Sequence, residues 1–260
     1  MIIIGEKLNS SIPSVKRLFD ADDREALSDL ILRQRDAGAD FIDLNTALCS
    51  DETGQIKLLC DIVLDKTDCG IVIDSPDMAV SKEVLAYIRG KDGNRKCVLN
   101  SITVNERHEN IETALKYKAG LVVLLTDESG IPGTEKRFEN AEKMINTLRS
   151  CGFNDGDIYI DAIVESVATG ADSAAVTLDT IKLIRAAFPD VHILVGLSNI
   201  SFGLPKRSCL NAAFLTLAVY NGLDCAICDP LSPDIKTAYL AAKALNGTDD
   251  FCMEYIDEFR

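Results

Sequence analysis

The chain contains no long apolar segment. None of its hydrophobic runs approaches the roughly 18 residues that a membrane-spanning helix needs, although 47% of its 260 residues are apolar. Its first residues, 1–6, lack the basic region and the cleavage site of a signal peptide. We therefore expect a cytoplasmic protein. No Pro/Gly/Ser-rich linker divides the chain either, so residues 1–260 are expected to form one domain around a large core.

Basic residues are scarce relative to acidic ones. The chain has 27 Lys and Arg against 41 Asp and Glu, which gives a net charge of -14. Binding to nucleic acid or to an anionic membrane requires clustered positive charge. The composition therefore argues against both as partners, and most of the acids are expected on solvated helix faces.

The common signals of metal and nucleotide sites are missing. The only two histidines, His108 and His192, belong to neither a His-x-x-x-His nor a His-x-Glu arrangement, so no zinc site is expected. No Gly-x-Gly-x-x-Gly opens a helix, and no Gly-x-x-x-x-Gly-Lys-Ser/Thr loop is present. Dinucleotide and P-loop nucleotide sites are therefore not predicted.

The nine cysteines are an odd, scattered set that does not indicate a disulfide framework. One Cys-x-x-Cys pair is present, Cys225 and Cys228, in a segment that reads as a strand. Residues three apart on a strand point to opposite faces. We therefore expect these two thiols to pack in the core rather than to share a metal ion or a local disulfide.

What the chain does have is a repeated pattern of short apolar runs that end in polar residues. Eight runs read as strands: residues 1–9, 41–45, 70–75, 97–101, 121–126, 157–161, 192–199 and 224–229. Segments with helical spacing lie between them. Strand-helix repeats of roughly 25 to 40 residues build parallel sheets. Eight such units predict an α/β fold, a closed (β/α)8 TIM barrel, with a doubly wound open sheet as the alternative.

In such a barrel the strands end at one mouth, where the active site lies. The polar residues expected there are Glu6, Asn9, Asp43, Asn45, Asp74, Ser75, Asn100, Ser101, Asp161, Ser198, Asn199 and Asp229. The set is rich in carboxylates and amides, with no histidine and no obvious lysine. It suits a flat heterocycle with a guanidine-like edge, such as a pterin, because a carboxylate accepts two parallel N–H bonds. The alternative for any one of these residues is that it caps the following helix.

Several of these residues stand in short motifs: Gly-Glu-Lys-Leu-Asn at 5–9, Asp-Leu-Asn at 43–45, Asp-Ser at 74–75, Asn-Ser at 100–101, residues 126–132, Tyr-Ile-Asp at 159–161, Gly-Leu-Ser-Asn-Ile-Ser at 196–201, residues 211–215 and residues 222–227. Together, over essentially the whole chain, they resemble the pterin-binding methyltransferases that move a methyl group between methyltetrahydrofolate and a corrinoid protein. They also resemble the folate module of cobalamin-dependent methionine synthase.

The resemblance implies roles for particular residues. Asp74, Asn100 and Asp161 would hold the pterin ring, and Asn199 would hydrogen-bond to N5, the nitrogen that gives or receives the methyl group. The other residues implied at the substrate site are Glu6, Asp43, Asn45, Gly196, Ser198 and Arg207. The resemblance also implies a homodimer. The chain has no Asp-x-His-x-x-Gly run, so the cobalamin is expected on a separate corrinoid protein that docks at the mouth.

The chemistry sets a further requirement. A methyl group on a tertiary amine leaves badly, because the departing nitrogen would be an anion, so N5 must be protonated or strongly hydrogen-bonded in the transition state. Asn199 can stabilise that state but cannot supply a proton. We expect the proton to come from solvent or through water, with Asp161 or Asp74 holding the ring tautomer.

Three rival functions remain open. Dihydropteroate synthase would require a lysine and an arginine at the end of the seventh strand, where this chain has Ser198 and Asn199. A Schiff-base aldolase would require a lysine on the sixth or seventh strand. A catalytically silent folate-binding subunit of a methyl-transfer complex would bind folate without transferring the methyl group.

Overall fold

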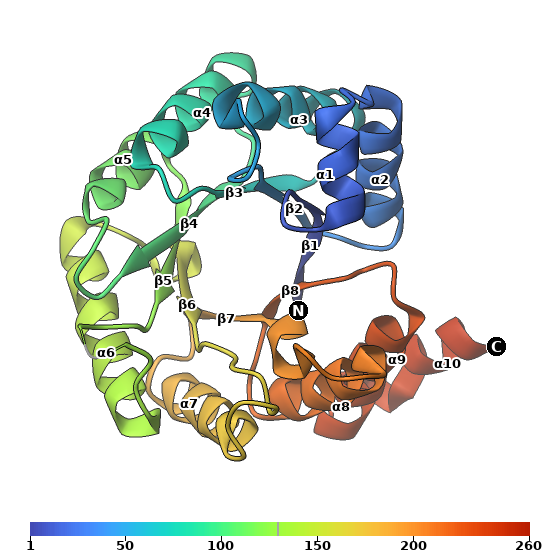
Figure 1. Cartoon of the computed structure of the whole chain (residues 1–260). Coiled ribbons are helices and arrows are strands. Elements are labelled where there is room, and N and C mark those ends of the chain that lie inside the picture. The colour runs from blue at the N-terminus through green and yellow to red at the C-terminus, as the bar shows by residue number, and fades with distance from the viewer. Residues whose placement is uncertain (129) are drawn as a thin grey trace.

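The computed structural model describes residues 1–128 and 130–260. Eight parallel strands form a closed barrel in chain order, and β8 pairs back with β1 (Figure 1). The predicted (β/α)8 barrel is therefore confirmed, and the open sheet is excluded. The strands are β1 (Ile2–Asn9), β2 (Phe41–Asn45), β3 (Gly70–Asp74), β4 (Cys97–Thr103), β5 (Gly120–Leu124), β6 (Ile158–Asp161), β7 (His192–Gly196) and β8 (Cys225–Cys228).

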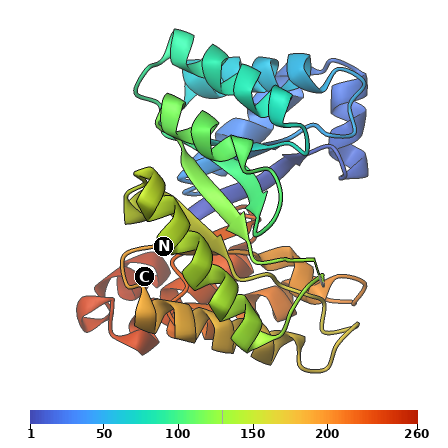
Figure 2. The ribbon, with the colours of Figure 1, turned by 90° about the vertical axis from the view of Figure 1, so that its left-hand side faces the viewer.

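Helices surround the barrel on all sides (Figures 1 and 2). They are α1 (Pro13–Asp20), α2 (Arg24–Asp36), α3 (Glu52–Lys66), α4 (Met78–Lys91), α5 (Glu109–Tyr117), α6 (Thr134–Cys151), α7 (Ser173–Ala187), α8 (Arg207–Tyr220), α9 (Pro233–Asn246) and α10 (Met253–Phe259). Short 3-10 turns are η1 (Asp155–Asp157), η2 (Leu197–Ser201) and η3 (Asp250–Cys252). None of the helices in the described part of the chain has the length and apolarity to cross a bilayer.

Part of the acid excess serves to start helices. Asp23, Asp51 and Asp77 precede α2, α3 and α4, and each carboxylate accepts a hydrogen bond from a backbone N–H of the first turn. These groups would otherwise lack partners, and a negative charge there also favours the helix dipole. These three aspartates lie on the loops before helices and are not among the residues predicted at the mouth.

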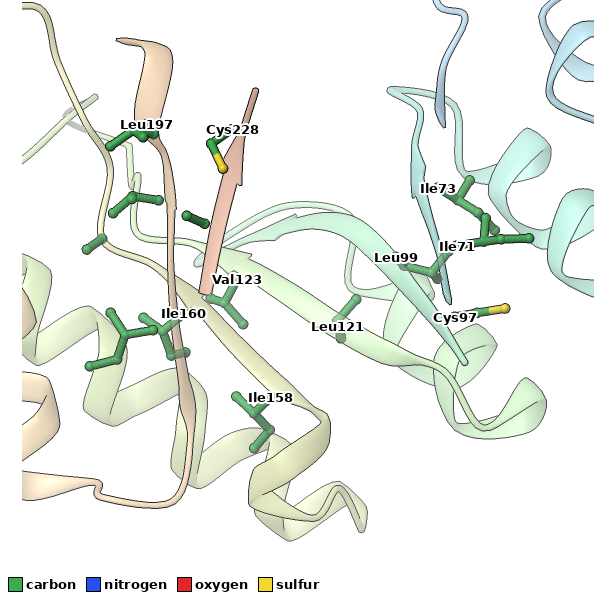
Figure 3. Close-up of a cluster of buried hydrophobic side chains, with 14 of the residues drawn as sticks. Ile71, Ile73, Cys97, Leu99, Leu121, Val123, Ile158, Ile160, Leu197 and Cys228 are labelled. Carbon is green, nitrogen blue, oxygen red and sulfur yellow. The ribbon is translucent and has the colours of Figure 1, made fainter. Parts of the chain in front are cut away.

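The core has two layers, one inside the barrel and one between the strands and the helices. The inner cluster takes one residue from each strand: Ile4, Phe41, Val72, Val98, Val122, Tyr159, Leu194 and Cys225. Side chains that alternate with these point outward and pack against the helices, among them Ile71, Leu99, Ile160 and Cys228 (Figure 3). Cys225 and Cys228 thus occupy opposite faces of β8 as free, fully buried thiols, as predicted.

The seventh strand differs from its prediction. The sequence predicted a strand over 192–199, but β7 ends at Gly196, and the chain turns into η2. Leu197 and Ile200 are buried in the outer layer, a three-residue spacing that suits a 3-10 turn better than a strand. Ser198 and Asn199 therefore lie on a turn above the strand end.

Ser129, within the 126–132 motif, lies outside the described residues.

Candidate active site

The predicted polar residues form a layer inside the barrel. Side chains on a strand alternate between faces, so the residues two positions beyond the inner cluster face the same interior, one step nearer the mouth. On six strands these are Glu6, Asp43, Asp74, Asn100, Asp161 and Gly196. The inner cluster closes the barrel beneath them. The sequence pattern and the barrel geometry thus bring five of the predicted polar side chains to one place.

Two strand irregularities coincide with this layer. The pairing of β1 with β2 shifts register between Gly5 and Leu8, and that of β4 with β5 shifts between Leu99 and Ile102. Such irregularities re-aim side chains and occur next to active sites. The residues within them include Glu6 and Asn100, so the ladder is interrupted where two members of the layer project.

Asp43 and Asp74 are adjacent acids on neighbouring strands. Asp43 is 2% exposed, and its Oδ1 has no hydrogen-bond partner among the described residues. Burial, and then the negative charge of Asp74, raise the pKa of Asp43 well above its usual range. Burial also raises the pKa of Asp74, although the Asn45 amide opposes this by donating a 2.7 Å hydrogen bond to Asp74 Oδ2. The two carboxyls therefore resist ionising together.

Asp161 ends β6 and is held by the turn that follows. Burial raises the pKa of Asp161 to about 6. A hydrogen bond from the Ile163 backbone N–H and the charge of Arg137 limit this rise, because both lower the pKa. At neutral pH this carboxyl is mostly ionised, so it can accept two parallel N–H bonds from a heterocycle. Asn100, on the far side of Asp74 from Asn45, makes no hydrogen bond through its amide to any described residue.

Arg137 supports the site and was not predicted from the sequence. It lies on α6, is 1% exposed, and donates hydrogen bonds to the carbonyl oxygens of Pro132, Ala162 and Ile163 at 2.7, 2.8 and 2.8 Å. It therefore fixes the turn that orients Asp161. A signal was present, because Arg137 falls four residues before Ala141 on the apolar stripe of α6.

Glu6 and Lys7 tie β1 to the last two strands. Ser198 Oγ donates a 2.6 Å hydrogen bond to Glu6 Oε1, and Lys7 Nζ lies 2.5 Å from Asp229 Oδ2. Burial raises the pKa of Glu6, and the Ser198 hydroxyl and the Lys7 charge oppose that shift. No lysine was predicted at the mouth. That prediction was wrong, because Lys7, within the register shift of β1, points toward the end of β8 and contacts Asp229.

Asn199 offers an unoccupied amide at the mouth. Its side chain is exposed and hydrogen-bonds to no described residue. It lies over Gly196, where a Cβ atom would come within 3.0 Å of Asn199 Nδ2. The missing side chain at Gly196 therefore makes room for the amide, and a ligand in the mouth can be its partner.

Gly196→Ala tests this placement. The backbone at Gly196, with φ −78° and ψ 88°, is open to alanine, so the added methyl group acts by displacing the Asn199 amide by a few tenths of an ångström. For the methyl transfer that the resemblance implies, we expect a rate about tenfold lower, with folate affinity nearly unchanged. Stopped-flow transfer rates and calorimetric titration measure the two. Gly90→Ala is the matched control, since its Cβ would meet nothing within 4 Å; equal rates for both variants would contradict the placement.

Arg207 supports the turn that carries Asn199. Its Nη2 donates a 2.6 Å hydrogen bond to the Ser198 carbonyl, and its Nε donates a 3.0 Å bond to Ser201 Oγ. The resemblance placed Arg207 at the substrate site. In this structure its guanidinium holds η2, and contact with a substrate stays a prediction.

Two other expected mouth residues bond elsewhere. Ser75 Oγ donates to Glu52 Oε1 at 2.6 Å, and Asn9 Oδ1 accepts from the Ser11 backbone N–H at 2.8 Å. Both bonds support loops, and neither side chain caps the following helix, since α1 has no side-chain cap and Asp77 caps α4. No cluster of three or more His, Cys, Asp or Glu side chains with metal-binding geometry is found in residues 1–128 and 130–260.

A larger cavity, about 780 Å³, opens at the other end of the barrel, beside Gly70, Gly120 and His192. Its floor includes Phe41 and Tyr159 of the inner cluster. In barrels of this fold, active sites lie at the carboxyl ends of the strands. The polar layer lies at that end, so we place the site there.

Comparisons with known proteins show which family the chain belongs to. A family model described as "Pterin binding enzyme" matches residues 8–229. The methylcorrinoid:tetrahydrofolate methyltransferase of Eubacterium limosum is 36% identical over all of this chain and 96% of its own length. The methionine synthase of Mycobacterium leprae is 31% identical over 87% of this chain and 20% of its own length.

Among solved structures, a dihydropteroate synthase of Yersinia pestis in complex with a sulfonamide drug superposes with a TM-score of 0.70. The match covers 95% of this chain and 94% of that one. Because the sequences are only 13% identical, it shows a shared fold and nothing more. The resemblance inferred from the motifs is confirmed by the family model and by the two relatives. The chain belongs to the family of pterin-binding enzymes.

Proposed function

We propose that this protein is a methyltransferase that moves a methyl group between N5 of tetrahydrofolate and the cobalt of a separate corrinoid protein. The observation that carries this is the layer that contains Asp74, Asn100, Asp161 and Gly196, with the open amide of Asn199 next to Gly196. The relative that matches over its whole length bears the name of this activity. The predicted enzyme class is thereby confirmed at the level of the family.

In this proposal the chain's own residues bind and orient the pterin. Asp161, ionised at neutral pH, and Asp74 accept N–H bonds from the amino-pyrimidine edge, while Asn100 supplies both a donor and an acceptor. Asn199, at the neighbouring strand end, then faces N5. Asn45 acts on the ring through Asp74, and Asp43 supports the layer from below. The cobalt on the partner protein supplies the nucleophile or the methyl group.

The partner and the assembly follow from the same reading. The corrinoid protein docks over the mouth, which must stay broad enough to admit it. We further propose that the chain works as one domain over residues 1–260, as a homodimer, in the cytoplasm. Nine free thiols support the last point, because cytoplasmic reductants keep cysteines reduced.

The rival functions have less support. Dihydropteroate synthase shares the barrel, yet Ser198 and Asn199 stand where that chemistry calls for basic side chains. The aldolase has no lysine on β6 or β7. A silent folate-binding subunit would not need an amide held open above Gly196.

The deciding experiment mixes the purified protein with tetrahydrofolate and a methylated corrinoid protein, and with 5-methyltetrahydrofolate and the reduced one. We expect methyltetrahydrofolate in the first mixture and methylated cobalt in the second, followed by cobalt absorbance and mass spectrometry. Folate binding without transfer in both would identify a silent subunit. Formation of dihydropteroate from a pterin pyrophosphate and 4-aminobenzoate would identify the synthase.

A further inference from the structure

A second pocket lies beside the mouth, and Glu6 is the member of the polar layer that lines it. The pocket has a volume of about 220 Å³ and is bordered by Glu6, Lys7, Ser198, Arg207, Ser208 and Asp229, among others. At roughly 30 Å³ per molecule it has room for about seven waters. Hydroxyl, ammonium and carboxylate groups on its wall can hydrogen-bond to a chain of them.

Methyl transfer needs a proton route, and the mouth cannot provide it during the reaction. When N5 attacks the methyl carbon, the Co–C bond breaks and its electron pair stays on the cobalt. N5 is left as a tertiary ammonium, which must lose its proton to give methyltetrahydrofolate. In the reverse direction the same proton must arrive. A corrinoid protein seated on the mouth would cover the direct path to solvent, so a lateral path is required.

We propose that Glu6 exchanges the N5 proton with solvent through water, and that the pocket beside β1 and η2 is the path. This inference rests on the proposed function. Glu6 lies close enough to Asp43 of the layer for its charge to raise the pKa of that carboxyl, and it also lines the pocket. It is also joined to the Asn199 turn, because Ser198 Oγ donates a 2.6 Å hydrogen bond to Glu6 Oε1.

The other acids of the layer are less suited to this exchange. Asp43 is 2% exposed, and burial and the charge of Asp74 raise its pKa, which disfavours the ionised form that accepts a proton. Asp74 is bonded to Asn45, and Asp161 to the Ile163 N–H. None of these three lines the lateral pocket.

The charges around Glu6 suit a proton relay. Burial and the Asp229 carboxylate raise the pKa of Glu6, whereas the Ser198 hydroxyl, Lys7 and Arg207 lower it. A relay works best when its pKa is brought toward the working pH. The titratable or charged groups that face Glu6 are Lys7 on β1, Asp43 on β2, Cys228 and Asp229 at the end of β8, and Arg207 on α8.

Single-turnover transfer from a methylated corrinoid protein to tetrahydrofolate, measured across pH, tests the proposal. Glu6 must be ionised to accept the proton, so the wild-type rate should rise as pH passes upward through its pKa. Glu6→Gln should lose this rise and be at least about tenfold slower on the plateau, with a calorimetric folate Kd within about threefold of wild type. Glu6→Asp, which keeps a carboxylate, should retain the rise.

Glu52→Gln is the matched control. Glu52 is also half-buried and also accepts a 2.6 Å hydrogen bond from a serine, Ser75, yet it does not line the pocket. Its pH profile should match wild type. A Glu6→Gln variant that is slowed by one factor at every pH, or not slowed, would overturn the relay and leave the proposed function standing. No transfer by the wild-type protein would overturn both.

Discussion

Asn199→Ala is expected to slow methyl transfer by about 10² to 10³ while changing folate affinity by less than about threefold. The amide is exposed at the mouth and without a partner among the described residues, so it contributes little to the fold. In the proposed function its hydrogen bond to N5 would strengthen as charge changes on that nitrogen, and a preorganised donor or acceptor of this kind contributes about 2.7–4 kcal/mol to the transition state.

The measurement is a stopped-flow transfer rate beside a calorimetric titration of tetrahydrofolate. An interaction that acts only in the transition state lowers the rate and leaves binding alone. Asn199→Asp tests whether the N–H donor of the amide is needed. It preserves the shape of the side chain but replaces the donor with a carboxylate oxygen. Equal losses of rate and affinity in Asn199→Ala would assign Asn199 to ground-state binding instead.

The barrel could be predicted because its information is local. A parallel strand buried on both faces leaves a continuous apolar run in the sequence, and the observed Phe41–Asn45 strand agrees residue for residue with the predicted one. Polar residues two positions past the inner cluster then reach the mouth by alternation alone. The order of residues along each strand is therefore enough to place Asp74, Asn100 and Asp161 together.

Contacts between distant segments could not be predicted in the same way. The Glu6–Ser198 bond joins residues 192 positions apart, and the turn of Lys7 toward Asp229 depends on a register shift in β1. The strand predicted over 192–199 was also too long, because apolar Leu197 continues the strand pattern past the end of β7 at Gly196. Tertiary packing decides each of these.

The largest stability effect is expected from Arg137→Met. The change keeps the apolar stem of the side chain but removes the Arg137 donor from the carbonyl oxygens of Pro132 and Ala162, whereas the Ile163 carbonyl keeps its bond from Thr177. Unsatisfied buried acceptors cost about 1–3 kcal/mol each, partly offset because a buried charge is no longer desolvated. We therefore expect the free energy of unfolding to fall by about 3 kcal/mol, measured by urea denaturation.

Arg149→Met is the control, on the same helix. Arg149 pairs with Asp155 at 2.7 Å on the surface, where an ion pair contributes at most about 1 kcal/mol.

Ile163 connects Arg137 to the proposed binding residue Asp161. Its φ of 58° is unusual for a β-branched residue, and both Arg137 and Thr177 bond to its carbonyl.

Without Arg137 that turn can relax, and the Ile163 N–H that orients Asp161 moves with it. Under conditions where it remains folded, Arg137→Met should therefore also bind tetrahydrofolate about tenfold more weakly, whereas Arg149→Met should bind as wild type does. Normal folate affinity in a destabilised Arg137→Met would mean that Asp161 is oriented without this turn. Equal stability losses in the two variants would mean that the carbonyls find other donors.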